Sequence, residues 1–411
     1  MRSISTLVIG AGQAGLAMSH CLSRQGIGHV VLEKAEIANA WRNQRWDSLR
    51  LLTPNWQNDL PGGLPNVAAP DGFATAEDFA AGLRDYARSI GAPVEERCEV
   101  SSVRAAGNGY EVRTNRGDWY CRSLILASGV NSRPYMPPFA REISAGIRQI
   151  TAHDYKNPQQ IAPGGVLVVG GSASGVQLAS EISAAGHEVT LSIGEHIRVP
   201  RFYRGHDIQL WMDRTGLHAQ PASLVADIDR ARRVPSFQLI GSAAERFLDL
   251  NSLQDQGVEI VGRLASIQDG AALFSGSLAN HCMLSDLKMN RLLDTIDAWI
   301  SERGLALPVP AERFAPTRVP RAPRLSEALG SGRFRTIVWA TGYVPDYSWL
   351  DLPVLDRKGR LIHDKGAVAP NLYALGLPFM RRRDSSLIGG AGRDATEIAQ
   401  ILDQTSRRKA G

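Results

Sequence analysis

Two glycine-rich loops carry the clearest chemical signal in this sequence. The first reads Gly10-Ala-Gly12-Gln-Ala-Gly15 and follows a run of apolar residues. In such a loop the first glycine permits a tight turn, and the second lets the backbone approach a pyrophosphate. The third allows a helix to pack closely on a sheet. The helix that follows would direct free amide groups and the positive end of its dipole at the phosphates. The loop therefore predicts a dinucleotide site.

Glu33 stands where such a site needs a carboxylate. It ends the next apolar run, about twenty residues beyond the loop, where its oxygens can accept both hydroxyls of a ribose. Together with the glycines it fits an ADP-ribose moiety, so we expect FAD rather than FMN. A glycine turn without a ligand is the alternative reading of the loop alone.

A second loop of the same kind begins at Gly170. Serine replaces the middle glycine, but a serine keeps the side chain small and can donate its hydroxyl to a phosphate. Two such loops in one chain predict two dinucleotide sites, the second for a nicotinamide cofactor. The residues assigned to it here are Gly170, Ser172, Ala173, Ser174 and Gly175.

Selection between NADPH and NADH depends on the charge just past the second strand of this unit, residues 189–193. Ser192 and Arg198 favour NADPH, whereas Glu195 stands where a basic residue would be expected and opposes it. The sequence predicts a preference for NADPH, weak enough that NADH is also used.

Two further turns end apolar strands. In two-dinucleotide flavoproteins such turns carry the chain between the FAD and nicotinamide domains, although any strand followed by a glycine turn would look similar. The turns are Ala127-Ser128-Gly129 and Ala340-Thr341-Gly342-Tyr343, and from them Ser128, Gly129, Thr341 and Gly342 are assigned to the cofactor sites.

Alternating strand and helix patterns surround these loops. A buried strand, a glycine loop, a helix and a second strand occur twice, which is typical of parallel Rossmann sheets. The expected strands span 4–9, 29–33, 98–104, 109–114, 118–127, 165–170, 189–193, 336–340 and 371–375. The expected helices run to about Gly26, to about Ala185, over 284–302 with one apolar stripe in the core, and from near Gly392 onward.

These patterns predict an α/β fold with two Rossmann-type domains, the nicotinamide domain inserted in the FAD domain. The expected boundaries are 1–157 for the first part of the FAD domain, 158–340 for the NAD(P)H domain, and 341–411 for its C-terminal part. The last helix would direct its N-terminus, near Gly392, at the pyrimidine edge of the flavin and stabilise negative charge there.

Composition narrows the function further. The 411 residues are 44% hydrophobic and 21% charged, and no stretch approaches the roughly 20 apolar residues that span a bilayer. The net charge is +5, but the basic residues are dispersed apart from the run Arg381 to Arg383, so neither a nucleic-acid nor a membrane partner is expected. We expect a cytoplasmic protein, and a homodimer is compatible with the sequence. Four separated cysteines include no C-x-x-C, so neither a redox dithiol nor a metal site is indicated.

The sequence resembles the bacterial branch of the flavin-containing monooxygenases (class B flavoprotein monooxygenases) over nearly the whole chain. The resemblance is carried by the stretch Gly10 to Gly15, Glu33, Trp41-Arg42, Ser172 to Gly175, and Ala340 to Tyr343. It implies FAD and NADPH as cofactors and places Trp41 and Arg42 at the cofactor site. It also implies that a hydroperoxyflavin oxygenates a small soft nucleophile, a sulfide or an amine, with dioxygen as co-substrate.

Two positions depart from that family. Its members carry a linker histidine before the second loop, but the nearest alignment places Thr151 there and displaces His153. An asparagine near the flavin is also typical, and Asn55 is the candidate catalytic residue, with an ordinary turn residue beside Pro54 as the alternative.

Two other functions stay open at this stage. A flavoprotein reductase would pass electrons from NAD(P)H to a protein or small acceptor, and a low-turnover flavoprotein would sense redox state or bind a partner. Residues 200–285, the region expected to line the substrate pocket, carry no readable motif.

Overall fold

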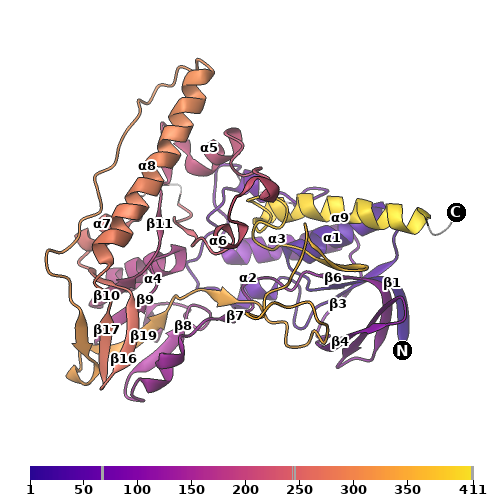
Figure 1. The fold of residues 1–411 in the computed structure, drawn as a ribbon, viewed down its shortest axis with the longest axis horizontal. Helices are drawn as coiled ribbons and strands as arrows, with labels where there is room; N and C mark the ends of the chain where they lie inside the picture. The colour runs from indigo at the N-terminus through magenta and orange to yellow at the C-terminus, as the bar shows by residue number, and fades with distance from the viewer. Residues whose placement is uncertain (66–68, 243, 245–246, 409–411) are drawn as a thin grey trace.

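The computed structural model describes residues 1–65, 69–242, 244 and 247–408, the side chains of 405–408 excepted. The described chain forms two lobes, each built on its own parallel sheet (Figure 1). The first lobe contains both the N-terminal strand and the C-terminal helix. The second contains the middle of the chain, from which one long helix projects.

The sheet of the first lobe has eight strands. Its order is β21-β22-β6-β1-β2-β3, with β5 pairing β6 and β4 pairing β5. The central pairs β1–β2, β1–β6 and β22–β6 are parallel, as expected for a Rossmann sheet. The strands are β1 (Arg2–Ile9), β2 (His29–Leu32), β3 (Val94–Glu95), β4 (Val100–Ala106), β5 (Gly109–Thr114), β6 (Trp119–Leu126), β21 (Ala367–Ala369) and β22 (Leu372–Ala374). The two ends of the chain thus share one sheet.

Three helices cover one face of this sheet: α1 (Gln13–Arg24), α3 (Ala76–Ser89) and α9 (Ile388–Arg408). Their apolar faces form a common core, in which Leu16 and Ile398 are fully buried. The helix α3 starts where Thr75 accepts a hydrogen bond from the Asp78 amide, a standard N-cap. The helix α9 begins at Ile388, one turn before the expected start near Gly392.

The sheet of the second lobe has five strands in the order β15-β10-β9-β19-β8, all parallel. Its strands and first helix are β8 (Arg148–Thr151), β9 (Gly165–Val169), α4 (Ala173–Ala184), β10 (Val189–Ile193), β15 (Glu259–Gly262) and β19 (Phe334–Trp339). Because β8 pairs with β19, this sheet takes in residues before the expected boundary at 158. A short antiparallel ribbon, β7 (Arg133–Pro134) with β20 (Tyr343–Val344), joins the two chain crossings between the lobes.

The region without a readable motif is an insertion in the second lobe. Its main helix, α8 (Leu278–Glu302), starts before the expected residue 284 and projects from the lobe in Figure 1. The apolar stripe of α8 is core as expected, since Met289, Leu293 and Ile296 are buried against Trp211. Its other elements are β11 (Ile197–Arg198), β12 (Phe202–Tyr203), β13 (His206–Asp207), α5 (Ile208–Arg214), α6 (Ile228–Ala231), β14 (Phe237–Gln238), α7 (Leu250–Asp255), β16 (Leu264–Gln268), β17 (Ala271–Phe274) and β18 (Ser326–Ala328).

Arg198 is part of this insertion's core, which corrects its assignment to the nicotinamide cofactor. Arg198 is 2% exposed. It pairs with Asp249 at 2.6 Å and with Asp286 at 2.7 Å, and so ties the start of α7 to α8. The guanidinium nitrogens that would bind a phosphate are already paired with these two carboxylates. Arg198 therefore stabilises the insertion and is not free to bind a cofactor phosphate.

Replacing Arg198 with methionine should therefore destabilise the protein. Arg198→Met leaves two poorly exposed carboxylates without their partner, which we expect to cost about 3 to 5 kcal/mol in the free energy of unfolding. Denaturant titration followed by circular dichroism measures this change. Lys288→Met, which removes a more exposed pair with Glu195, is the control and should cost less than about 1 kcal/mol. Equal effects of the two variants would contradict a core role for Arg198.

Candidate functional site

The first glycine loop has the geometry of a phosphate-binding turn. Gly10 has φ = +107°, and a side chain there would overlap the Ala127 carbonyl. A side chain at Gly15 would overlap the Gly10 carbonyl, so α1 can approach β1 only with glycine at that position. At Gly12, by contrast, a Cβ atom would meet no heavy atom within 4 Å. The backbone at Gly12 is thus open toward the cavity that it lines.

The second loop repeats this geometry. Gly170 has φ = +125° and lies against Ala340, and Gly175 packs on the Gly170 carbonyl. Ser172 takes the position of Gly12 with nearly the same backbone, φ −89° and ψ −171° against φ −82° and ψ −172°. Its side chain makes no capping hydrogen bond to α4. The hydroxyl is therefore available to a phosphate at the helix N-terminus.

A cavity of about 510 Å³ extends from the first loop, within the range of ligand pockets. Glu33 lies at one end. Its Oε2 accepts a hydrogen bond from the Ala11 amide at 2.8 Å, and its Oε1 accepts one from the Ala35 amide at 3.0 Å. These bonds fix the carboxylate while each oxygen retains a lone pair for a ribose hydroxyl. Ser128 and Gly129 line the same cavity.

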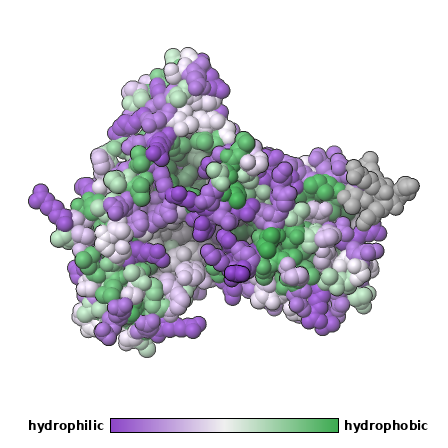
Figure 2. Space-filling model, viewed as in Figure 1, coloured by the Kyte–Doolittle hydropathy of each residue, from purple (hydrophilic) through white to green (hydrophobic). Residues whose placement is uncertain are grey.

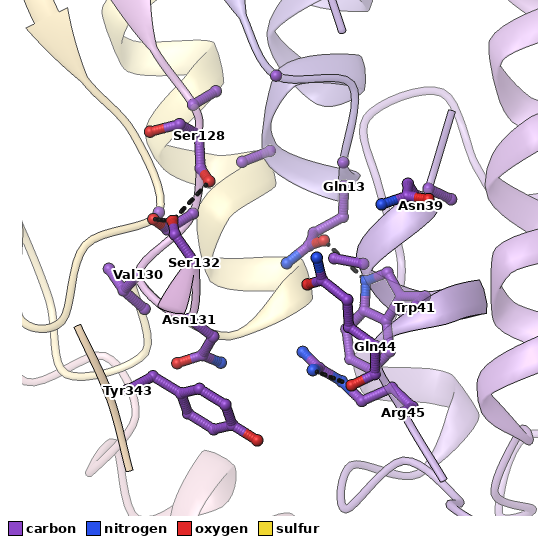
Figure 3. A pocket seen from close by; sticks show the side chains of 18 of the residues that line it. Gln13, Asn39, Trp41, Gln44, Arg45, Ser128, Val130, Asn131, Ser132 and Tyr343 are labelled. Atoms are coloured by element: carbon purple, nitrogen blue, oxygen red, sulfur yellow. Dashed lines mark hydrogen bonds between the residues drawn. The ribbon is translucent and has the colours of Figure 1, made fainter. Parts of the chain in front are cut away.

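The short helix α2 (Asn39–Asn43) forms one wall of this cavity. Trp41 lines it and donates from Nε1 to Gln13 Oε1 at 3.0 Å, which attaches α2 to the first residue of α1. Arg42, which was assigned to the cofactor site with Trp41, instead points to the surface and pairs with Glu36. Arg45, which the sequence reasoning missed, lines the cavity in its place. Figure 3 shows Arg45 on one side of the cavity, across from Asn131 and Tyr343.

The N-terminus of α9 lies at the other end of the cavity. Ser386, Leu387 and Ile388 line it, whereas Gly392 does not. A Cβ atom at Gly392 would lie 2.8 Å from the Pro61 Cδ atom. Gly392 therefore serves helix packing, which corrects its assignment to the flavin. A larger residue there would displace the loop at Pro61 before it could affect a cofactor.

Asn55 does not line the cavity, which corrects its assignment as the catalytic residue. It is 7% exposed. Its Nδ2 donates to the Ala69 carbonyl at 3.0 Å and its Oδ1 accepts from the Ala74 amide at 3.1 Å. Both ends of the amide thus hold a loop in place. The residues of this segment that do reach the cavity include Leu52 and Thr53.

A second cavity of about 1570 Å³ extends from the second loop. The residues assigned to the nicotinamide cofactor that line it are Gly170, Ser172, Ala173, Ser174, Thr341 and Gly342. Figure 2 shows hydrophilic side chains, in purple, across the central region between the two lobes.

Ser192 also touches this cavity, but its hydroxyl is already used. It donates to the Gly262 carbonyl at 2.9 Å and accepts from the Leu264 amide at 2.8 Å. With its single proton engaged, Ser192 fixes β10 to β15 and is not a phosphate donor, which corrects its assignment. Among the basic residues that line this cavity, the exposed Arg263 lies beside Gly194, just past β10, and the sequence did not predict it. Arg263 directly follows β15. A sequence-based prediction that considers only the residues just after β10, the second strand of the Rossmann unit, therefore misses it.

The two cavities meet at Tyr343. Leu52, Asn131 and Ser174 also line both. Burial raises the pKa of the Tyr343 hydroxyl. The Tyr343 ring lies on that of His153, with centroids 4.8 Å apart. The displaced linker histidine is therefore close to the junction.

His153 is neutral at neutral pH. Burial, and secondarily the positive charge of Arg45, lower the pKa of His153 to about 4. Thr151, which stands at the family's histidine position, donates instead to Asp154 at 2.7 Å within the linker. No other side chain in the described part of the protein accepts from or donates to His153 Nε2.

The insertion holds the segment that lines the junction. Arg201 is 1% exposed and donates from Nη1 to the Leu52 carbonyl at 2.6 Å, while Asp207 neutralises its charge. Gly241 packs so closely on Leu51 that a side chain there would overlap its carbonyl. The insertion thus fixes the position of Leu52, a contact that no local pattern in the sequence encodes.

The state of the cysteines and the character of the helices are also relevant to function. All four cysteines are buried and free. Over the described ranges, none of the helices combines the length and the apolar character needed to traverse a bilayer.

Comparison with known proteins adds independent information. The sequence profile of the pyridine nucleotide-disulphide oxidoreductase family matches residues 7–204. An uncharacterized CzcO-like oxidoreductase of Geobacillus kaustophilus is 31% identical over 396 residues, 95% of this chain and 96% of that protein. The indole-3-pyruvate monooxygenase YUCCA1 of rice is 30% identical over 201 residues, 47% of this chain and 48% of that protein.

A solved structure shares the fold over almost the full length. The flavin-containing monooxygenase from Stenotrophomonas maltophilia superimposes with a TM-score of 0.69 at 20% identity, covering 99% of this chain and 100% of that one. This likeness confirms the expected fold of two dinucleotide-binding domains.

A side chain at position 12 should abolish flavin binding without unfolding the protein. Gly12→Val places a branched side chain in open space that the fold does not need but a pyrophosphate would fill. We expect the purified wild type to be yellow with FAD, and the variant to be colourless with an unchanged circular dichroism spectrum. Gly82→Val, also in open space but away from the cavity, is the control and should keep its flavin. Full flavin content in Gly12→Val would refute the assignment of this loop.

Proposed function

The chain belongs to the family of CzcO-like oxidoreductases and is a flavin-dependent oxidoreductase, and on that premise we propose that it is an FAD- and NAD(P)H-dependent monooxygenase. Its substrate would be a small soft nucleophile such as a sulfide or an amine. The observation that carries the proposal is the meeting of two matched dinucleotide cavities at Tyr343 and Ser174. A flavin held at one loop and a nicotinamide held at the other would meet there.

The residues of the first cavity fit FAD. Gly12 leaves room for a pyrophosphate, the N-terminus of α1 faces it, and Glu33 can hold the adenosine ribose. The flavin, once bound and reduced by the nicotinamide, supplies the redox chemistry. The chain's own contribution is to position the ring at the N-terminus of α9, whose free amides would favour negative charge on the reduced ring.

Oxygenation, disulfide reduction and electron transfer to a separate acceptor differ in which group receives the electrons of the reduced flavin. Disulfide reduction of the usual kind needs an accessible pair of thiols, and all four cysteines here are buried and free. Oxygenation needs a site that excludes water, and apolar Leu52 and Val130 line the junction of the cavities. These observations favour oxygenation over a dithiol reductase.

The balance of the proposed reaction is that of a monooxygenase. A bound nicotinamide would supply two electrons as hydride; with one proton from solvent, one atom of dioxygen would enter the substrate and the other would leave as water. Electron transfer to a separate acceptor is the second candidate, and a redox-sensing or partner-binding role is the third. Neither of these would place oxygen in a product.

Arg263 and Glu195 bear on the choice of nicotinamide. The Arg263 side chain lies beside Gly194, at the end of β10 where the adenosine ribose is expected. No described residue forms an ion pair with it. Glu195 opposes a 2′-phosphate, but Lys288 pairs with it at 2.8 Å and offsets its charge. The balance supports a modest preference for NADPH.

Arg263→Gln should reverse that preference. We expect kcat/KM for NADPH to fall about tenfold, equivalent to about 1.4 kcal/mol, with kcat/KM for NADH nearly unchanged, because only NADPH carries the 2′-phosphate. Glu195→Arg should shift the preference further toward NADPH. Arg291→Gln removes a charge on the exposed side of α8 and is the control. An equal loss with both nucleotides would show that Arg263 does not read the 2′-phosphate.

Oxygenation itself is tested with labelled dioxygen. We expect one atom of ¹⁸O from ¹⁸O₂ in the product of a thioether, a tertiary amine or a 2-oxo acid, the last included because the rice relative is an indole-3-pyruvate monooxygenase. Mass spectrometry of the products measures this. Rapid mixing of reduced enzyme and NADP⁺ with oxygen should also give a transient absorbance band distinct from oxidised and reduced flavin. Direct return to oxidised flavin with hydrogen peroxide, for every substrate, would instead favour the reductase.

A further inference from the structure

Arg45 is a cation that the described protein leaves without an anion. It lines the first cavity, and its guanidinium lies 5.3 Å from the centre of the Trp41 ring. Among the described residues, the guanidinium donates one hydrogen bond, from Nη1 to the carbonyl of the adjacent Gln44 at 2.9 Å. No carboxylate in the described ranges pairs with the half-buried Arg45, whereas the two buried arginines of these ranges, Arg198 and Arg201, each have one.

A second cation, Lys156, lies beside Arg45, and the carboxylates that interact with Lys156 are those of Asp47 and Asp154. Burial lowers the pKa of the Arg45 guanidinium, and the hydroxyl of Tyr343 acts in the opposite direction. Lys156 donates to the carbonyl oxygens of Asn43 and Arg45, at 2.6 and 2.9 Å, and brings its ammonium to the same end of α2. A desolvated charge without a partner is unfavourable. An anion entering the cavity would remove that cost.

The position of Arg45 identifies where such an anion would come from. On one side, Trp41 joins α2 to Gln13, the first residue of α1, where the pyrophosphate of FAD is expected. On the other side, Tyr343 and Ser174 line both cavities, and Ser174 lies at the start of α4, where the pyrophosphate of the nicotinamide cofactor is expected. Figure 3 shows the Arg45 side chain extending from the α2 wall toward Asn131 and Tyr343.

We propose that Arg45 is an anion-binding residue for a dinucleotide pyrophosphate at the boundary between the two cavities. The proposal rests on the proposed use of FAD and a nicotinamide by this chain. A guanidinium suits this role because its planar donors can bind two phosphate oxygens at once. Arg45 itself lines the first cavity, and Tyr343, with which it interacts, lines both.

The test compares Arg45→Gln with Arg42→Gln in the holoenzyme. Both arginines stem from the α2 region, but Arg42 is exposed, pairs with Glu36 and does not line the cavity. Two quantities are measured without turnover: the FAD retained per protein after dialysis, and the Kd for NADP⁺ by calorimetry. We expect at least a tenfold loss in one of them for Arg45→Gln and less than a twofold change for Arg42→Gln.

The two measurements separate the two pyrophosphates. A weaker Kd for NADP⁺ with full FAD content assigns Arg45 to the nicotinamide, and loss of FAD assigns it to the flavin. Arg45→Lys, which keeps the charge but not the planar donors, should give an intermediate loss, and it replaces Arg45→Gln if that variant does not fold. Inorganic pyrophosphate should compete with NADP⁺ less well for the variant than for the wild type if the nicotinamide is the source.

Unchanged FAD content and an unchanged Kd for NADP⁺ in Arg45→Gln would overturn the proposal. A change confined to the KM of an anionic substrate would also overturn it, because Arg45 would then bind the substrate. Since neither binding measurement involves oxygen, a failure of the monooxygenase function leaves this result interpretable.

Discussion

Everything in this molecule depends on two contacts that only glycine permits. At Gly15 and again at Gly175, a helix packs so closely on the preceding turn that a side chain would overlap a main-chain carbonyl. This approach brings the first turn of each helix to the end of its sheet, so that amides which have no partner within the helix face a cavity. Residues from the other segments of the chain line the cavities at those two helix N-termini.

The sequence was sufficient to predict the parts of the structure that follow from local patterns. Periodicity and glycine spacing predicted both Rossmann units, because strand, loop and helix there are contiguous in the chain. The assignment of both chain ends to one lobe agrees with the pairing of β22 with β6. The start of the second lobe was less predictable, because β8 joins its sheet by pairing with β19, almost two hundred residues later in the chain.

Individual side chains of the site were harder to predict for the same reason. Arg198 and Arg263 are both arginines near the end of a strand, and nothing local distinguishes them. What distinguishes them is their partners, which are distant in the sequence. Asp249 and Asp286 form ion pairs with Arg198, whereas Arg263 lines a cavity. Asn55 was misplaced in a similar way, because its amide is bonded to a loop whose course the sequence does not show.

The ribbon formed by β7 and β20 has a mechanical consequence. Both crossings between the lobes run through it, hydrogen-bonded to each other, and it ends at Tyr343. Because the two crossings are hydrogen-bonded side by side, they could act together as one hinge rather than as two independent tethers, provided that other contacts between the lobes, such as that of Arg201 with the Leu52 carbonyl, yield. A rotation of the lobes about this hinge would change the width of the junction while each glycine turn, rigid within its own lobe, kept its shape. If FAD and a nicotinamide bind as proposed, such a rotation would change the distance between their ring systems while each nucleotide stayed at its loop.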